Sequence, residues 1–136
     1  MKLLFDTNVV LDVLLDRKPW VVAGKALWQA NDEQRITGYI TATTLTDIFY
    51  VARKVRDLHH AREAILICLA AFQVCPIGRG ELEQAISLSS NDFEDNLQIA
   101  AAVRAGLDAI VTRNKEDFAS SPIAVLSPDE AVAQIL

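Results

Sequence analysis

Four aspartates lie at or near the expected starts of helices. Asp6 follows the apolar residues 2–5 and opens the triplet Asp6-Thr7-Asn8, and Asp92 and Asp95 precede an alanine-rich segment. Asp47 lies near the start of another segment with helical spacing. Carboxylates that share one pocket repel one another, whereas Mg²⁺ or Mn²⁺, which prefer oxygen ligands, would keep them ionised. Together the four aspartates predict a divalent-metal site.

Each aspartate also has a purely structural explanation. Asp6 and Asp92 suit helix N-caps, because a capping carboxylate accepts hydrogen bonds from free backbone N–H groups. Asp95 would lie in the first turn of its helix, where the helix dipole favours negative charge. Thr44 and Asp47 stand at capping-box spacing, although Asp47 points away from the apolar stripe of its helix. Capping explains any one of these residues, whereas a metal site better explains all four.

A second polar triplet, Thr112-Arg113-Asn114, follows the apolar strand expected around Ile110. In open α/β sheets, ligand sites lie outside the carboxyl ends of the strands. The two triplets, one after an early strand and one after a late strand, are therefore the places where a site is expected.

The hydrophobic pattern predicts strands that alternate with helices. Strands are expected at residues 2–5, 35–40, 72–77, 108–112 and 123–126, and helices at residues 9–15, 19–30, 44–55, 61–71, 79–89, 97–105 and from 127 onward. Such alternation implies an α/β fold, a three-layer α/β/α sandwich with a central, mainly parallel sheet. With no repeat or linker in the sequence, residues 1–136 are expected to form a single domain.

The composition indicates an ordered protein, and the N-terminal stretch and the cysteines suggest that it is cytoplasmic. Hydrophobic residues make up 51% of the 136 positions, and charged residues 23%. The apolar N-terminal stretch ends at Asp6, which is too short for a signal peptide, and no stretch is long enough to cross a membrane. Cys68 and Cys75 lie in apolar segments and are expected to be buried thiols, which suits a reducing compartment.

The net charge of −5 argues against a general nucleic-acid coat, because sequence-independent binding depends on Lys and Arg. It does not exclude a nuclease, since basic residues could contact a nucleic-acid backbone or could equally be solvated. These are Arg53, Lys54, Arg56, Arg62, Arg113 and Lys115. The adjacent His59 and His60 do not have the spacing of a zinc pair and are expected at the surface. Trp20 and Trp28 are interpreted as packing residues.

In their order and spacing, these motifs resemble those of the PIN domain family, which includes the VapC-like toxins of bacterial toxin–antitoxin pairs. The resemblance extends over essentially the whole chain. It rests on Asp6-Thr7-Asn8, on Asp92-Phe93-Glu94-Asp95 before the alanine-rich helix, and on the segment from Thr112 to Phe118.

The resemblance implies hydrolysis of RNA phosphodiester bonds with Mg²⁺ or Mn²⁺ as cofactor. Asp6, Asp47 and Asp95 are then the metal ligands, with Asp47 standing where many members carry Glu. Either Asp117, as a fourth catalytic acid, or Asn114 completes the site. The supporting polar residues are Asn8, Asp92, Thr112 and Asn114.

The partners implied by the resemblance are an RNA substrate, a small antitoxin protein and a second copy of the chain in a homodimer. One alternative is a PIN-fold module that binds RNA or metal and is catalytically weak or inactive. A more distant alternative is a flavodoxin-like or receiver-like domain that uses strand-end aspartates for phosphate or Mg²⁺ chemistry.

Overall fold

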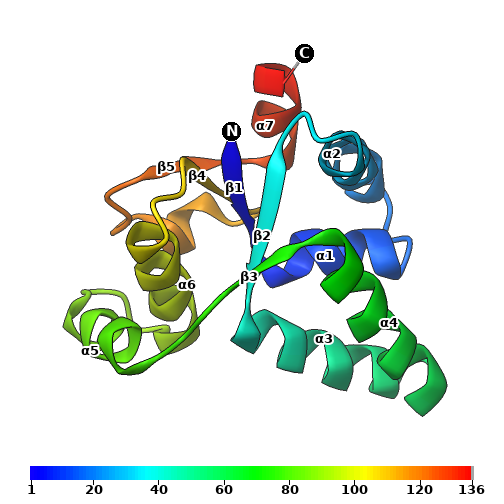
Figure 1. Cartoon of the computed structure of the whole chain (residues 1–136), viewed down its shortest axis with the longest axis horizontal. Coiled ribbons are helices and arrows are strands. Elements are labelled where there is room, and N and C mark those ends of the chain that lie inside the picture. Colours follow the sequence, from blue (N-terminus) through cyan, green and yellow to red (C-terminus); the bar gives the residue numbers. More distant parts are fainter. Residues whose placement is uncertain (136) are drawn as a thin grey trace.

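A parallel sheet forms the centre of the molecule, as seen in a computed structural model that describes residues 1–135 (Figure 1). Its strands lie in the order β3-β2-β1-β4-β5, and all neighbours pair in parallel. Their bounds are Lys2–Phe5 for β1, Thr37–Thr41 for β2, Gln73–Cys75 for β3, Ala109–Val111 for β4 and Ala124–Leu126 for β5. The predicted α/β fold with a parallel sheet is confirmed.

Helices cover both faces of this sheet. They are α1 Thr7–Leu14, α2 Val21–Asp32, α3 Ala42–Val55, α4 Leu58–Ala71, α5 Arg79–Ser87, α6 Phe93–Arg104, the 3₁₀ helix η1 Lys115–Phe118, and α7 Pro128–Ile135. Figure 1 shows α5 and α6 on one side of the central strands and α1, α2 and α4 on the other. The predicted three-layer sandwich is therefore confirmed. Within residues 1–135, no helix is both long and apolar enough to span a membrane.

Successive side chains of β1 serve two separate cores, as the alternation of a strand requires. Leu3 and Phe5 belong to the core shared with α1, α2, α3, α4 and α7. Leu4 belongs to a second core with Ile110, residues of α6 and Phe118. All four named side chains of β1 and β4 are almost completely buried, because helices cover both faces of a parallel sheet.

The order of the strands places the carboxyl ends of β1 and β4 side by side. After β1 the chain adds β2 and β3 on one side, and then returns to add β4 on the other side of β1. Phe5 is opposite Val111, and the backbone N–H of Asp6 donates to the carbonyl of Val111 at 3.0 Å. At this switch point the flanking connections diverge, which opens a crevice.

The C-terminus of α6 is fixed by a glycine. Gly106 has φ of +69°, a left-handed conformation that glycine adopts without steric cost. Its N–H donates to Val103, and the N–H of Leu107 donates to Ala102, which is the Schellman arrangement. The chain thus turns sharply from α6 toward β4.

Several helices begin at other residues than expected, and the starts of α3 and α6 are the ones that bear on the candidate site. The helix α3 begins at Ala42, because the Thr41 side chain caps it by accepting from the N–H of Thr44 at 3.2 Å. The expected capping box of Thr44 and Asp47 is therefore wrong, and Asp47 lies in the second turn. The helix α6 begins at Phe93 rather than at residue 97, because Asp92 is its N-cap.

The side chains expected in the interior mostly lie there. Cys68 and Cys75 are free and buried, and burial raises the pKa of Cys68 to about 12 and that of Cys75 to about 11. Trp28 packs edge-on against Phe72, with ring centroids 4.8 Å apart. Trp20 differs, because it is 44% exposed.

Candidate active site

An acidic cavity of about 400 Å³ opens where β1 and β4 end. The starts of α1 and α6, one face of α3 and the segment after β4 form its walls. Its lining residues are Asp6, Thr7, Asn8, Leu11, Asp47, Tyr50, Val51, Asp92, Glu94, Asp95, Gln98, Asn114 and Asp117. Every predicted site residue except Thr112 lines this cavity, and Thr112 lies directly behind Asp6.

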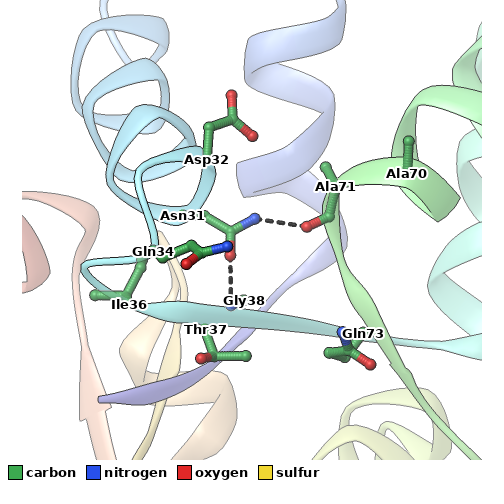
Figure 2. A pocket seen from close by; sticks show the side chains of 9 residues that line it. All are labelled: Asn31, Asp32, Gln34, Ile36, Thr37, Gly38, Ala70, Ala71 and Gln73. Carbon is green, nitrogen blue, oxygen red and sulfur yellow. Dashed lines mark hydrogen bonds between the residues drawn. The ribbon is translucent and has the colours of Figure 1, made fainter.

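A larger cavity, of about 560 Å³, lies near the beginnings of β2 and β3 and has a different character (Figure 2). The Asn31 amide donates to the carbonyl of Ala71 at 2.7 Å and accepts from the N–H of Gly38 at 2.8 Å. These bonds join α2 to β2 and to the end of α4. Asp32 is the one ionisable side chain among its lining residues, so this cavity lacks convergent catalytic groups.

Asp6 is the most firmly held carboxylate of the acidic cavity, and it is 7% exposed. Its Oδ1 accepts from the N–H of Thr7 at 2.8 Å and from Nε2 of Gln98 at 3.0 Å, while Oδ2 accepts from Oγ1 of Thr112 at 2.8 Å. Thr112 Oγ1 in turn accepts from the N–H of Asn114 at 3.1 Å. Asp6 is therefore both the N-cap of α1 and a carboxylate with a fixed direction.

Asp47 contacts Glu94, a residue that sequence reasoning did not single out. A hydrogen bond with Asp47, followed by burial and by the charges of Asp47, Asp92 and Asp95, raises the pKa of Glu94 to about 8. The available signal was its place between Asp92 and Asp95 at the start of α6. Asp47 thus meets a second acidic side chain, and the pair can share a proton at neutral pH.

Asp95 projects from the first turn of α6. Its backbone N–H donates to the capping carboxylate of Asp92 at 3.0 Å. Burial, with the charges of Asp92, Asp6 and Asp117, raises the pKa of Asp95 to about 7. The carboxylates of the cavity thus lie close enough to oppose one another's ionisation.

Gln98 and Thr44 are further polar residues that sequence reasoning missed. Gln98 is buried, and three residues after Asp95 it lies on the same face of α6. Its Nε2 binds Asp6, while its Oε1 has no hydrogen-bond partner within residues 1–135. Thr44 lies 3.0 Å from Thr7 between hydroxyl oxygens, which joins α3 to α1. Both residues hold the walls of the cavity together.

The acidic cavity has the ligand chemistry of a divalent-cation site. Six carboxylates line it, and a cation between them would lower the raised pKa values of Glu94 and Asp95. Across residues 1–135, no three Asp, Glu, His or Cys side chains are already placed to hold a metal. Asp6 is buried and fixed, whereas Asp47, Glu94 and Asp95 are partly exposed, so a complete ligand set would require these three side chains to rotate toward a common point.

Comparison with known proteins gives a consistent family. A family model described as PIN domain matches residues 2–116. The chain is 28% identical over 137 residues to Ribonuclease VapC1 of Aquifex aeolicus (strain VF5), covering 95% of this chain and 92% of that protein.

Solved structures share the fold. A toxin–antitoxin complex from Klebsiella pneumoniae contains a chain that is 25% identical, with a TM-score of 0.67 over 92% of this chain and 96% of that chain. DNA-bound VapBC from Salmonella typhimurium contains one that is 16% identical, with a TM-score of 0.73 over 94% of this chain and 98% of that chain. At 16% identity, the similarity to the Salmonella typhimurium chain shows only that the two chains share a fold.

Proposed function

The chain belongs to the PIN domain family, and on this basis we propose that it is a metal-dependent endoribonuclease that cleaves RNA in the acidic cavity. The observation that carries the proposal is the convergence of Asp6, Asp47 and Asp95 on one cavity at the switch point of the sheet, from the start of α1, the second turn of α3 and the first turn of α6. The relative from Aquifex aeolicus, named a ribonuclease and similar over nearly the whole chain, supports the same reaction class.

The proposed metal ligands are Asp6, Asp95 and Asp47, with Mg²⁺ or Mn²⁺ as the cofactor. When bound, such a cation activates a water molecule and stabilises negative charge on the phosphate. Asp6 presents a carboxylate whose direction is fixed by Thr112 and Gln98. Glu94 is hydrogen-bonded to Asp47 and lines the same cavity, so its carboxylate is a further candidate ligand beside the shorter Asp47.

The remaining polar residues orient these carboxylates and the substrate. Asp92 caps α6 and so fixes the first turn that carries Asp95. Asn114 and Asp117 line the wall after β4, where Asp117 adds a fourth catalytic carboxylate and Asn114 a neutral amide. Asn8 lines the rim beside Asp6.

We further propose that the protein is the toxin of a toxin–antitoxin pair, acts as a homodimer and folds as a single domain. The toxin assignment is supported by the Klebsiella pneumoniae chain of the toxin–antitoxin complex, which aligns over nearly all of this chain. The single domain is supported by the five strands β1 to β5, which all belong to one sheet. Co-expression with the protein encoded by a neighbouring small reading frame, followed by co-purification, tests the antitoxin.

A catalytically weak module that binds RNA or metal is the second candidate. It is favoured by Asn114, which places a neutral amide rather than a carboxylate on the wall of the cavity after β4. Tight Mn²⁺ binding without RNA cleavage would support it.

Cleavage of single-stranded RNA with Mg²⁺, Mn²⁺ or EDTA tests the main proposal. We expect cleavage with either cation and none with EDTA. Asp6→Asn and Asp95→Asn should each lower the rate by at least about 100-fold, the upper end of the loss seen when mere supporting residues of metal sites are removed. Asp129→Asn, a matched change of an exposed aspartate on α7, should have no effect. Equal rates in wild type and both cavity variants would refute catalysis in this cavity.

A further inference from the structure

An exposed tryptophan in the turn between α1 and α2 packs against an arginine that follows β4. Trp20 is 44% exposed, and the Arg113 guanidinium carbon lies 4.1 Å from the centroid of its ring. Arg113 stands between Thr112, which binds Asp6, and Asn114, which lines the cavity. The ring is thus one arginine side chain away from the wall of the cavity.

A buried aspartate fixes this arginine. Asp12 is 1% exposed, and its Oδ2 lies 2.9 Å from Nε of Arg113, while its Oδ1 accepts from Nη2 at 3.2 Å. Nη1 of Arg17 lies 3.8 Å from the same Oδ1. One carboxylate therefore faces two guanidinium groups, which leaves an excess positive charge. The ion pair also holds Arg113 against the ring of Trp20.

Arg17 connects this group to the rim of the cavity. Its Nη1 donates to Oδ1 of Asn8 at 3.4 Å, and Asn8 lines the cavity. The long contacts of Arg17 to Asn8 and Asp12, and the 31% exposure of its side chain, leave its guanidinium accessible to a ligand.

An acidic cavity in an acidic protein poses a problem for an RNA substrate. The cavity contains six carboxylates and the chain carries a net charge of −5, so phosphates are repelled unless cations lie nearby. Proteins that bind single-stranded RNA combine positive groups along the backbone with aromatic rings on which bases stack. Trp20, Arg17 and Arg113 supply both kinds of group next to the lining residues Asn8 and Asn114.

We propose that Trp20, Arg17 and Arg113 form a subsite for single-stranded RNA. The exposed part of the Trp20 ring stacks on a base near the scissile phosphate, while Arg113, held by Asp12, covers one face of the ring. Arg17 contacts a phosphate between that base and the cavity. This subsite rests on the proposed ribonuclease function and names the residues that would hold an unpaired base next to the cavity.

Fluorescence of Trp20 tests the stacking directly. Trp28→Phe leaves Trp20 as the sole tryptophan of the sequence, and Asp95→Asn in the same protein removes cleavage under the proposed function. Titration with a single-stranded oligoribonucleotide should quench the emission. The same sequence annealed to its complement should not quench it, because the bases of a duplex are already stacked on one another.

Binding of the oligoribonucleotide to variants in the Asp95→Asn background gives the second readout. Trp20→Ala should raise Kd about 5- to 50-fold, as for loss of one base–aromatic stack, whereas Trp20→Phe should retain most of the affinity. Arg17→Ala should weaken binding and reduce the slope of log Kd against log salt by about one phosphate contact. The control Arg79→Ala removes an arginine that is 91% exposed on α5, and should change neither quantity.

Failure of this proposal is separable from failure of the function. If wild type cleaves RNA while Trp20→Ala and Arg17→Ala bind and cleave as wild type does, the subsite is refuted and the ribonuclease stands. Quenching by duplex and single strand alike would also refute the subsite. If wild type neither binds nor cleaves RNA, both proposals are overturned.

Discussion

The hydroxyl of Thr112 donates a 2.8 Å hydrogen bond to Oδ2 of Asp6, across 106 residues of sequence. The bond joins the carboxyl ends of β1 and β4, the two strands that meet at the switch point of the sheet. It is buried, and the same hydroxyl accepts from the N–H of Asn114. Thr112 therefore sets the position of Asp6 relative to the wall of the cavity that Asn114 forms.

Replacement of Thr112 by Val should destabilise the protein and impair the site. Valine keeps the shape of the side chain but removes the donor to a buried carboxylate, which should cost about 1–3 kcal/mol in the free energy of unfolding. Urea unfolding measures this cost, and RNA cleavage should fall in parallel. Thr112→Ser, which retains the hydroxyl, should behave close to wild type. A Val variant as stable and active as wild type would show that the bond does not hold Asp6.

Replacement of Glu94 by Gln should weaken metal binding without destabilising the fold. Glutamine resembles the protonated form that the raised pKa of Glu94 favours in the metal-free protein, so thermal stability in EDTA should be unchanged or higher. Mn²⁺ affinity, measured by calorimetric titration, should fall about 10- to 100-fold. Glu116→Gln, at an exposed position on η1, is the matched control and should bind Mn²⁺ normally. Unchanged affinity in Glu94→Gln would remove this residue from the site.

The stability of the metal-free protein should decline as pH rises. The pKa of Glu94 is about 8 against an ordinary 4.5, and that of Asp95 is about 7 against an ordinary 3.8. The folded state thus binds these protons more tightly than the unfolded state, and the associated stability is complete below about pH 4. This contribution of the two protonated carboxyls to the free energy of unfolding is lost progressively as pH rises to 7 and 8.

Melting temperatures in EDTA between pH 5 and pH 8.5 test this dependence. The difference between wild type and a Glu94→Gln/Asp95→Asn double variant isolates these two groups from the rest of the chain. Wild type should lose stability relative to the double variant across the range, and Mg²⁺ should restore it at the alkaline end. Parallel curves would mean that the pKa values of these two carboxyls are not raised in the folded protein.

The fold was predictable from local signals that agree with the tertiary structure. Asp6 and Asp92 cap the helices expected from their positions, and α6 ends at Arg104, one residue before the end of the expected helix of residues 97–105. The α3 start was mispredicted, because Thr41 and Thr44 are both competent caps in sequence. Thr44 is used instead in a contact with Thr7 of α1, and only the packing of α3 against α1 reveals this.

The residues that line the acidic cavity were predictable where a strand end or a helix start marked them. The lining residues that carry such a mark are Asp6, Asp95, Asn114 and Asp117. Glu94 and Gln98 were missed because their roles depend on contacts with Asp47 and Asp6, far away in sequence. A search of the α6 face that carries Asp95 would have found Gln98, since residues three apart share a face.

Crystals soaked in Mn²⁺ and measured at the manganese absorption edge give the most direct test of the claim that the acidic cavity is a metal-dependent catalytic site. The structure predicts an anomalous peak within coordination distance, about 2.0–2.2 Å, of Asp6 and Asp95 oxygens, with Asp47 or Glu94 rotated toward it. Asp95→Asn crystals should show a weaker peak or none. A fully soaked wild-type crystal with no manganese between Asp6 and Asp95 would contradict the account.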